Sequence, residues 1–568
     1  MASTFFYSRV RAAFAGLGVV CALWSLPCVR AADGEPQQAS AIASGEGTVP
    51  APASPDPAEL VRRLGDPDYY VREDAQRQLI EMGIAARPFL REALQSDDLE
   101  IATRAEYILQ RLKVEWVKPT DPPEVQRLMA AYGQMELTRR LEIIGQLAGL
   151  PEYRGLPALA RIACYESDEE IAFAAAYEVF YRRPEGRRDL ATYLTAMGEL
   201  PAVQGDLPAA AVAAFQRLHT DDQGIAFAEE VLERFRENAG RLTGDGARVE
   251  MLLLYETAEQ LLKAGRDADA EHYAAEARSR MGTIDNEALE AHLTVGYKLR
   301  ARGLTDWAAG EFELLCDSDE LLAGRFGCSA LAEMWHDQGL DAKAAEAVEA
   351  YFAKFGDDVE NLQFGRDELF RELQARGRYF LACRYAAEGD TEKQLAALRR
   401  ALEIYPYEID TLIALYRLSE GRPRLRQEAI DKIAAAVDRY RGDIESNPKS
   451  PTNYNQLAWL LANTDDPFGE AVRLAETAVE LDPVASAYHD TLGRAYFSQG
   501  LLSKAIQSQA RALELEPYSG LLRKQFREFV EAWRERFPGR PLPLDVEKLS
   551  PEVGEFLQSI EAPAEATS

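Results

Sequence analysis

Histidine, cysteine and aromatic residues are scarce in this chain of 568 residues. Five histidines and six cysteines are scattered along it, and Phe, Trp and Tyr together make up 9% of the composition. Neither Cys-x-x-Cys nor His-Glu-x-x-His occurs, so the sequence lacks the clustered ligands of a zinc site. The glycine-rich phosphate loop and the Gly-x-Ser-x-Gly elbow are also absent. We therefore expect no metal, no cofactor, no catalytic residue and no enzymatic activity.

Positive charge is also in deficit. The chain holds 64 Lys and Arg against 94 Asp and Glu, which gives a formal net charge of -30. Such a chain is repelled by the phosphates of nucleic acid and by an anionic membrane surface. Acid pairs such as Glu169 with Glu170 are abundant, and we interpret them as solvated turn and capping residues rather than catalytic pairs. The composition indicates a protein or peptide partner and excludes nucleic acid.

Long uncharged runs are missing except near the N-terminus, over residues 12–29. Arg9 and Arg11 precede this run, and a small-residue cleavage pattern ends it at Ala31. We interpret residues 1–31 as a bacterial-type signal peptide cleaved near Ala31, which predicts a secreted or periplasmic protein. The alternative is an uncleaved membrane anchor over residues 12–29. Both interpretations place the rest of the chain outside the cytoplasm, and no other membrane insertion is expected.

Two segments lack the periodic apolar positions of secondary structure. Residues 32–57 are rich in Pro, Ala, Gly and Ser, and residues 538–568 hold five prolines and end in EAPAEATS. Segments of this composition cannot bury enough apolar surface to offset the entropy lost on ordering. We predict a disordered linker over residues 32–57 and a loosely ordered tail over residues 538–568.

Apolar residues at helical spacing begin directly after the linker. An acidic turn followed by an Ala-containing helix occurs three times, as GDPDYYVREDAQRQL, QSDDLEIATRAEYIL and YESDEEIAFAAAYEVF. The Asp residues in these turns are suited to cap helix N-termini. The three copies resemble HEAT-type repeats, in which helix pairs stack into a superhelix. We assign residues 58–190 to a HEAT-like section and residues 191–250 to a helical transition segment.

A different repeat, of about 34 residues, follows from residue 251. Its best copy spans residues 486–519, with small residues at the helix contacts, a glycine turn and a proline at the end: Leu492, Gly493, Tyr496, Gly500, Ala505, Ala512 and Pro517. Small side chains let two helices approach closely, and proline ends a helix because it lacks an amide donor. This pattern resembles the tetratricopeptide repeat. We assign residues 251–519 to an array of such repeats and residues 520–537 to a helix that caps its end.

Both resemblances imply one fold class, an all-α, right-handed α-solenoid of stacked helical hairpins, HEAT-like and then tetratricopeptide. In such arrays, one face of each first helix lines a concave groove. On the family's pattern, the candidate partner-binding residues are Tyr255, Glu259, Tyr297, Arg300, Glu333, His336, Tyr379, Asn455, Asp490 and Arg494. The alternative for Tyr255, Tyr297 and Tyr379 is packing between repeats. Because Asp490 stands where a clamp for a terminal carboxylate needs a basic residue, an internal segment or a basic ligand suits this groove better.

The resemblances imply a non-enzymatic scaffold outside the cytoplasm that binds a partner peptide or helix in the groove. A structural component of an envelope assembly is the nearest alternative, and an undetected hydrolase within residues 114–250 is a third. Cys316 and Cys328 lie twelve residues apart across an expected helix-helix turn. They either form a disulfide or pack separately as small apolar side chains, and the sequence leaves both possibilities open.

Overall fold

The computed structural model describes residues 56–561, apart from residues 110, 113, 199, 201–205, 362–367 and 466–468. Within these ranges every regular element is an α-helix or a short 3-10 helix, and no strand occurs. The expectation of an all-α fold built from stacked helical hairpins is confirmed. The proposed signal peptide and almost all of the proposed linker lie outside the described residues. No helix in the described ranges has the length and apolar character to span a bilayer.

The described part of the chain divides into two compact units. Unit 2 ends at Val179 and takes in Met197–Gln216, whereas unit 1 contains Phe180–Ala196 and everything from Arg217 onward. The expected boundaries at residues 190 and 250 therefore do not coincide with the division between the units. One reason is that α13 begins at Asp245 and packs against α12, so no break in packing occurs near residue 250.

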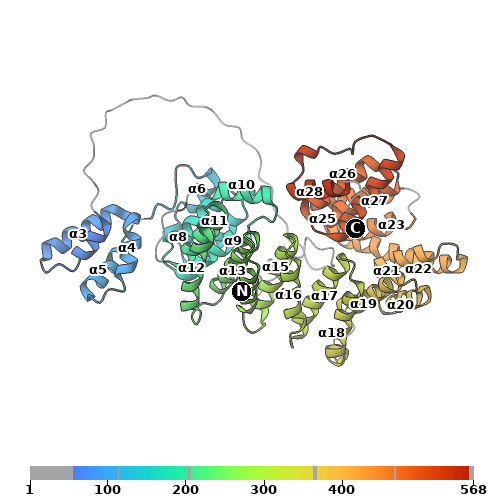
Figure 1. Cartoon of the computed structure of the whole chain (residues 1–568), viewed down its shortest axis with the longest axis horizontal. Helices are drawn as coiled ribbons and strands as arrows, with labels where there is room; N and C mark the ends of the chain where they lie inside the picture. Colours follow the sequence, from blue (N-terminus) through green and yellow to red (C-terminus); the bar gives the residue numbers. More distant parts are fainter. Residues whose placement is uncertain are drawn as a thin grey trace. The chain divides into compact units, whose positions relative to one another are not determined.

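Unit 2 is built from short helices, several of which are labelled in Figure 1. Its helices, including α9 and α11, which each reach into unit 1, are α2 (Pro57–Arg63), α3 (Tyr69–Met82), η1 (Gly83–Ala86), α4 (Arg87–Ala93), α5 (Leu99–Leu109), α6 (Pro123–Met129), η2 (Tyr132–Gln134), α7 (Leu137–Ala148), η3 (Pro151–Tyr153), α8 (Leu156–Tyr165), α9 (Glu169–Tyr181) and α11 (Leu207–Thr220).

The acidic turns of unit 2 act as helix caps, as the sequence predicted. Asp68 accepts a hydrogen bond from the Tyr70 amide at 2.8 Å, and Asp98 accepts one from the Glu100 amide at 2.9 Å. Asp168 does the same for the amide of Ile171. Each carboxylate satisfies an amide that has no partner within its own helix, and its charge interacts favourably with the helix dipole.

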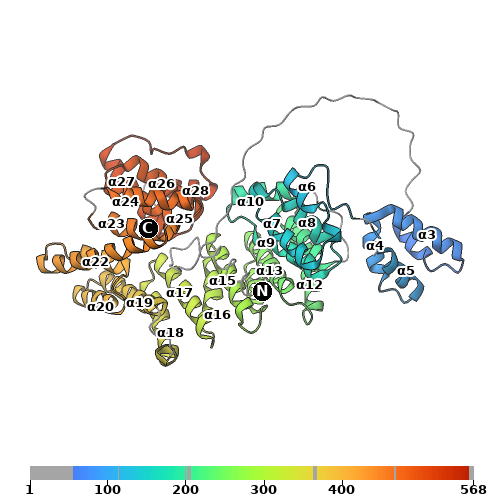
Figure 2. The ribbon, with the colours of Figure 1, turned by 180° about the vertical axis from the view of Figure 1, so that it is seen from behind.

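Unit 1 is a row of helical hairpins, seen from opposite sides in Figures 1 and 2. Its helices are α10 (Arg187–Met197), α12 (Gly224–Asn238), α13 (Asp245–Lys263), α14 (Asp267–Ser279), α15 (Asn286–Ala301), α16 (Thr305–Cys316), α17 (Leu321–Asp337), α18 (Asp341–Asn361), α19 (Glu368–Ala387), α20 (Thr391–Ile404), α21 (Ile409–Leu418), α22 (Pro423–Ser446), α23 (Pro451–Ala462), α24 (Glu470–Leu481), α25 (Ser486–Ser498), α26 (Leu502–Leu515), α27 (Gly520–Arg536), η4 (Val546–Lys548) and α28 (Pro551–Glu561). Each odd-numbered helix from α13 to α25 pairs with the helix that follows it.

The hairpin α25–α26 shows why the repeat needs small residues. A Cβ atom added at Gly493 would lie 3.3 Å from the Ala505 backbone oxygen, so the two helices already touch at this point. Ala505 itself is fully buried. The turn that follows places Gly500 at φ 71°, a backbone conformation that side-chain-bearing residues rarely adopt. The residue types that carried the resemblance therefore set the geometry of the hairpin.

The C-terminal part of unit 1 confirms one expectation and corrects another. Helix α27 buries Phe526 and Phe529, as expected of a helix at the end of an array. The tail, in contrast, is not loosely ordered throughout, because Pro551–Glu561 form helix α28. Val553 and Phe556 of α28 belong to the same apolar core as α27. These two apolar residues have helical spacing in the sequence, but the prolines of residues 538–568 favoured the prediction of a loosely ordered tail.

Unit 1 also contains contacts that the repeat pattern did not predict. Asp337, at the end of α17, accepts hydrogen bonds from the Ser519 hydroxyl at 2.6 Å and from the amides of Gly520 and Leu521 at 3.1 Å each. Asp337 thus caps the N-terminus of α27, which begins more than 180 residues further along the chain. The possible disulfide between Cys316 and Cys328 is formed, which links the end of α16 to α17.

Candidate functional site

All of the predicted groove residues lie on six helices of unit 1, and all but Tyr255 keep some exposure to solvent. We call this set of surfaces the groove face: the sides of α13, α15, α17, α19, α23 and α25 that carry Glu259, Tyr297, Arg300, Glu333, His336, Tyr379, Asn455, Asp490 and Arg494. Most of these side chains are half-buried, and Glu259 and Asn455 are buried. The side chains of the groove face are therefore partly packed against their neighbours and do not project freely into solvent.

Tyr255 is the exception, and its prediction as a partner-binding residue is wrong. Its side chain is fully buried, its hydroxyl donates to the carboxylate of Glu311, and its ring lies 6.1 Å from that of Trp307. Burial and the adjacent Glu311 raise the pKa of this phenol. Tyr255 packs between α13 and α16, which is the alternative that the sequence left open.

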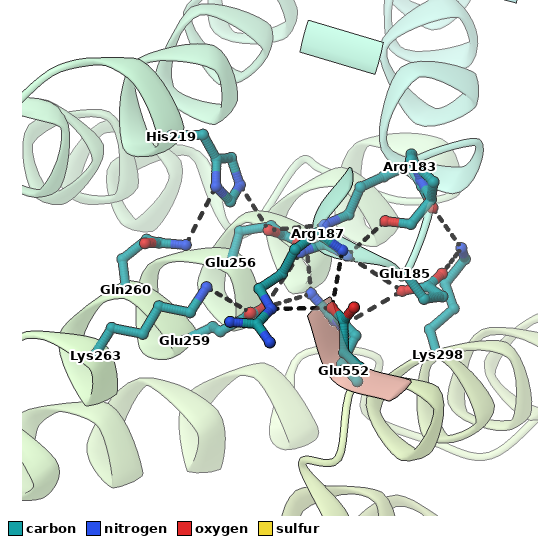
Figure 3. Close-up of polar contacts among 12 residues, drawn as sticks. Arg183, Glu185, Arg187, His219, Glu256, Glu259, Gln260, Lys263, Lys298 and Glu552 are labelled. Carbon is teal, nitrogen blue, oxygen red and sulfur yellow. Dashed lines mark hydrogen bonds and ion pairs between the residues drawn. The ribbon is translucent and has the colours of Figure 1, made fainter. Parts of the chain in front are cut away.

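The first part of the groove face centres on Arg183, a residue that the sequence analysis missed (Figure 3). Its guanidinium lies 3.0 Å from the Glu256 carboxylate and 3.5 Å from that of Glu259. Arg302 reaches the same two carboxylates, at 2.7 and 2.8 Å. We call Arg183, Glu256, Glu259 and Arg302 the Arg183 cluster. Two buried carboxylates and two buried guanidiniums balance each other in charge, as burial of charge requires.

The charges in the Arg183 cluster shift the acid-base behaviour of its members. Burial opposes the ionised form of Glu256, but Arg183, Arg302 and a hydrogen bond with His219 outweigh it and hold its pKa well below the usual value. Burial likewise opposes ionisation of Glu259, and Arg302 lowers its pKa on balance. Both carboxylates are thus ionised at neutral pH and present a permanent negative charge to any guanidinium on this face.

Arg183 is carried by a short irregular segment that lies on the groove face. This segment, residues 182–186, connects α9 to α10 and includes Pro184, which cannot donate a backbone hydrogen bond. Lys298 of α15 holds it through the Glu185 carboxylate at 2.6 Å and the Arg183 carbonyl at 3.3 Å. Directly after the segment, Arg187 at the start of α10 pairs with Glu552 of α28 at 3.0 Å. A short irregular stretch of the chain itself therefore contacts helices α13 and α15 on this face.

A cavity of about 390 Å³ opens beside this segment. The residues that line it come from the end of α9, the segment and α15: Tyr181, Arg182, Arg183, Glu185, Thr294, Tyr297, Lys298 and Ala301. The cavity joins the predicted groove residue Tyr297 to the Arg183 cluster. Its volume matches a side chain or a short stretch of peptide.

A second group of charges lies further along the groove face, around Arg376 of α19. Its guanidinium pairs with Glu333 of α17 at 2.6 Å, with Glu408 at 3.0 Å and with Asp410 of α21. The indole of Trp459 on α23 donates to Asp410 at 2.9 Å. Residues Glu333, Arg376, Glu408 and Asp410 form what we call the Arg376 cluster. The cluster links the first helices of three successive hairpins, α17, α19 and α21, and Trp459 extends the connection to α23.

The last part of the groove face carries the predicted residues Asp490 and Arg494. Asp490 accepts hydrogen bonds from the amides of Gln509 at 2.6 Å and Gln525 at 2.8 Å, and Arg494 pairs with Glu528 at 2.6 Å. Burial raises the pKa of Asp490 to about 6, against the opposing effects of Gln509 and Arg494. Gln509 stands where an aromatic is usual in the repeat, and its amide is one of the two that donate to Asp490.

Asn455 lies on α23, which also carries Trp459, and it is the least satisfied residue of the groove face. Its side chain is only 9% exposed, yet its Oδ1 atom has no hydrogen-bond donor among the described residues. Burying an acceptor without a donor costs about 1–3 kcal/mol. A donor on a bound partner would recover that cost, so Asn455 is a candidate contact residue on structural grounds as well as from the sequence.

We expect Glu372→Gln to stabilise unit 1 at alkaline pH. Burial, reinforced by the charge of Glu408, raises the pKa of Glu372 to about 7. Since the folded state holds this proton more tightly than the unfolded state, Glu372 makes stability fall as pH rises from about 4.5 to about 7. The uncharged amide removes that loss. The urea midpoint of the variant should exceed that of the wild type at pH 8 and match it at pH 4; equal midpoints at pH 8 would contradict the burial argument.

Comparison with known proteins supports the repeat assignment near the C-terminus. Residues 487–519 match the tetratricopeptide repeat family, which includes most of the best copy identified by spacing. Small glutamine-rich tetratricopeptide repeat-containing protein 2 of Mycosarcoma maydis is 29% identical over 90 residues. The alignment covers 16% of this chain and 25% of that relative, so the chain spans about a quarter of the relative's length. The chain thus contains a tetratricopeptide repeat.

Two solved structures are similar at low sequence identity. The tetratricopeptide domain of P58(IPK) is 14% identical, with 73% of this chain and 99% of that chain covered and a TM-score of 0.18. A structure of Naa15/Naa10 bound to HypK-THB is also 14% identical, with 88% and 83% covered and a TM-score of 0.20.

Proposed function

We propose that this protein is a non-enzymatic scaffold that binds an extended, basic segment of another protein on its groove face. The observation that carries the proposal is the placement of Arg183. Its guanidinium, on an irregular segment, is buried between the Glu256 and Glu259 carboxylates of a repeat helix. The chain's own segment thus supplies a template for the ligand that such a surface accepts.

Electrostatics favours the same class of partner. The formal net charge is -30, and carboxylates line the groove face from Glu259 to Asp490. A basic segment is attracted to such a surface over about one Debye length, roughly 8 Å at physiological ionic strength. A partner's C-terminal carboxylate would be repelled. Tetratricopeptide arrays generally mediate contacts between proteins, which agrees with this proposal.

The location of the protein belongs to the proposal as well. We propose export through residues 1–31, or retention by residues 12–29 as an anchor, so that the partner is met in a secreted or periplasmic setting. We also keep the HEAT-like assignment of residues 58–190 as a proposal. Its support is the threefold recurrence of acidic caps at Asp68, Asp98 and Asp168.

A hydrolase within residues 114–250 receives less support from the cavity. Among the residues that line it, Thr294 carries the one aliphatic hydroxyl, and none of these lining residues is a histidine that could act as a base. Glu185 and Lys298 are paired with each other at 2.6 Å. The lining therefore suits binding better than nucleophilic chemistry.

The test is capture of a partner from an envelope extract by the full chain. Replacing Tyr379, Asn455 and Arg494 together with alanine should reduce the retained partner at least tenfold, because this triple variant removes a ring, a hydrogen-bonding amide and a charge from the groove face. The partner should elute as salt rises, since its charge is screened.

The matched control is a triple alanine variant at Lys393, Arg400 and Arg473, whose side chains are at least 62% exposed on second helices of hairpins. It should retain the partner. Equal capture by both triple variants would refute the groove assignment. A partner that resists salt and always co-purifies in fixed stoichiometry would instead favour the structural envelope component.

A further inference from the structure

Three side chains of different chemical types lie close together where α17, α18 and α19 meet. They are His336 near the end of α17, Asp341 at the start of α18 and Cys383 in α19. One potential ligand atom from each lies within 4.8 Å of the other two, and His336 Nδ1 is 2.5 Å from an Asp341 carboxylate oxygen. Imidazole, carboxylate and thiol are the three ligand types that proteins use for zinc.

The spacing of these atoms fits a metal ion after small side-chain adjustments. Zinc bonds of about 2.0–2.3 Å in a tetrahedron place neighbouring ligand atoms about 3.3–3.8 Å apart. The His336–Asp341 pair is closer than this, and an ion between the two groups would replace their hydrogen bond. Asp341 is the first residue of α18 and its side chain is partly exposed, so binding of an ion requires only that this side chain move away from His336.

The surroundings of the three groups support a bound ion. The rings of Tyr379 and Phe380 lie 5.5 and 5.0 Å from the His336 ring and fix its orientation. The His336 and Asp341 side chains are 12% and 19% exposed, so an ion can reach them from solvent. This combination of held ligands and an open side is typical of sites with three protein ligands and one exchangeable position.

The charges around the site are mixed but include carboxylates beyond its own. Asp410 interacts electrostatically with both His336 and Cys383, and Arg376 interacts with Cys383 in the opposite sense. Burial, followed by the charge of Asp341, raises the pKa of the Cys383 thiol to about 12. The thiol is therefore protonated before a metal binds, and an ion must displace that proton to form a thiolate bond.

We propose that His336, Asp341 and Cys383 bind a zinc ion, with the fourth position left to water or to a group of the partner. This proposal stands apart from the basic-segment proposal, although the ion would tie together helices that carry Glu333, His336 and Tyr379 of the groove face. Sequence spacing does not reveal this site, because Cys383 lies 47 residues after His336. Folding brings them together through the hairpin geometry.

The probe is Co²⁺, which takes zinc sites and reports on its ligands by absorption. The full chain, with Cys21 and Cys28 replaced by serine in every sample and the 316–328 disulfide left oxidised, is freed of metal and titrated. One equivalent should produce the near-ultraviolet thiolate-to-cobalt band together with the visible bands of a tetrahedral ion. Zn²⁺ should abolish both, and excess Mg²⁺ or Ca²⁺ should abolish neither, because these ions avoid thiolates.

Variants identify the ligands. Cys383→Ser should remove the near-ultraviolet band, and His336→Ala should weaken Zn²⁺ binding at least about tenfold, the smallest loss seen even for outer contacts of a zinc site. Cys164→Ser and His272→Ala are the matched controls and should change nothing, since Cys164 lies in unit 2 and His272 is exposed on α14. Persistence of the band in Cys383→Ser would overturn the proposal.

A measurement on the unmodified site guards against a variant that fails to fold. One equivalent of Zn²⁺ should slow alkylation of Cys383 by iodoacetamide about tenfold or more, the smallest effect usually seen when a contact of a zinc site is lost. The alkylation of Cys164 should not change. Equal alkylation of Cys383 with and without Zn²⁺ would show that the carboxylates of this acidic chain bind the ion elsewhere, and the site would be refuted.

Discussion

Replacing Arg183 with alanine should lower the free energy of unfolding of unit 1 by about 3–5 kcal/mol, the usual cost of breaking a buried ion pair. The Arg183 side chain is only 4% exposed and that of Glu256 only 3%. Without Arg183, Glu256 keeps Arg302 and His219 as partners and Glu259 keeps Arg302 and Lys263, but the cluster loses one of its two buried guanidiniums. Urea denaturation followed by circular dichroism measures the loss, and hydrogen exchange of α13 and α15 locates it.

The effect of Arg183→Ala should depend on pH in a definite direction. Because the folded-state pKa values of Glu256 and Glu259 lie below the ordinary 4.5, their ion pairs stabilise the fold above that pH and lose their effect as pH falls below it. The variant and the wild type should therefore converge in acid. Arg400→Ala, which removes an exposed i,i+3 ion pair with Glu403, is the control and should leave the urea midpoint unchanged. A urea midpoint for Arg183→Ala equal to that of the wild type at neutral pH would contradict the conclusion that the buried Arg183 cluster stabilises unit 1.

Replacing Phe526 with alanine should cost about 3–5 kcal/mol, as expected for truncation of a fully buried phenylalanine. Its ring lies 6.0 Å from that of Phe556 in α28, so the cavity would also loosen the C-terminal helix. Limited proteolysis should cut residues 551–561 faster in this variant than in the wild type. Leu521→Ala, at a position 43% exposed, is the control and should behave as the wild type does. A loss below about 1 kcal/mol, far from the usual range, would mean that α28 does not pack on α27.

The hairpins could be predicted because their determinants are local. Gly493 and Ala505 are small where two adjacent helices touch, and Pro517 follows the C-cap residue of the second helix. Asp68 and Asp98 cap helices that begin at the next residue. Each of these relations spans a few residues or one hairpin, so spacing in the sequence was enough to infer it.

The chemistry of the groove face could not be predicted in the same way. Whether Arg376 meets Glu333, Glu408 or Asp410 depends on the stagger between neighbouring hairpins, which a repeat pattern does not specify. The register assigned Tyr255 to the groove face, and the structure buries it instead against Trp307 of another hairpin.

Arg183 was beyond sequence reasoning for a different reason. It precedes its partners Glu256 and Glu259 by more than 70 residues and lies outside any helix. No periodicity marks such a segment, and its proline suggests only a loop. The same limitation hid the convergence of His336, Asp341 and Cys383, since contacts between hairpins bring together residues whose spacing in the chain carries no signal.

The most direct test of the groove-face proposal is site-specific photocrosslinking with p-benzoyl-L-phenylalanine at position 297, in the cavity beside the Arg183 cluster, and at position 400 on an exposed helix surface. Mass spectrometry then identifies the captured segment. We predict crosslinks from position 297 to a partner segment that contains arginine or lysine, lost at high salt, and none from position 400. Crosslinks from position 400 alone, or from position 297 to an acidic segment, would contradict the account.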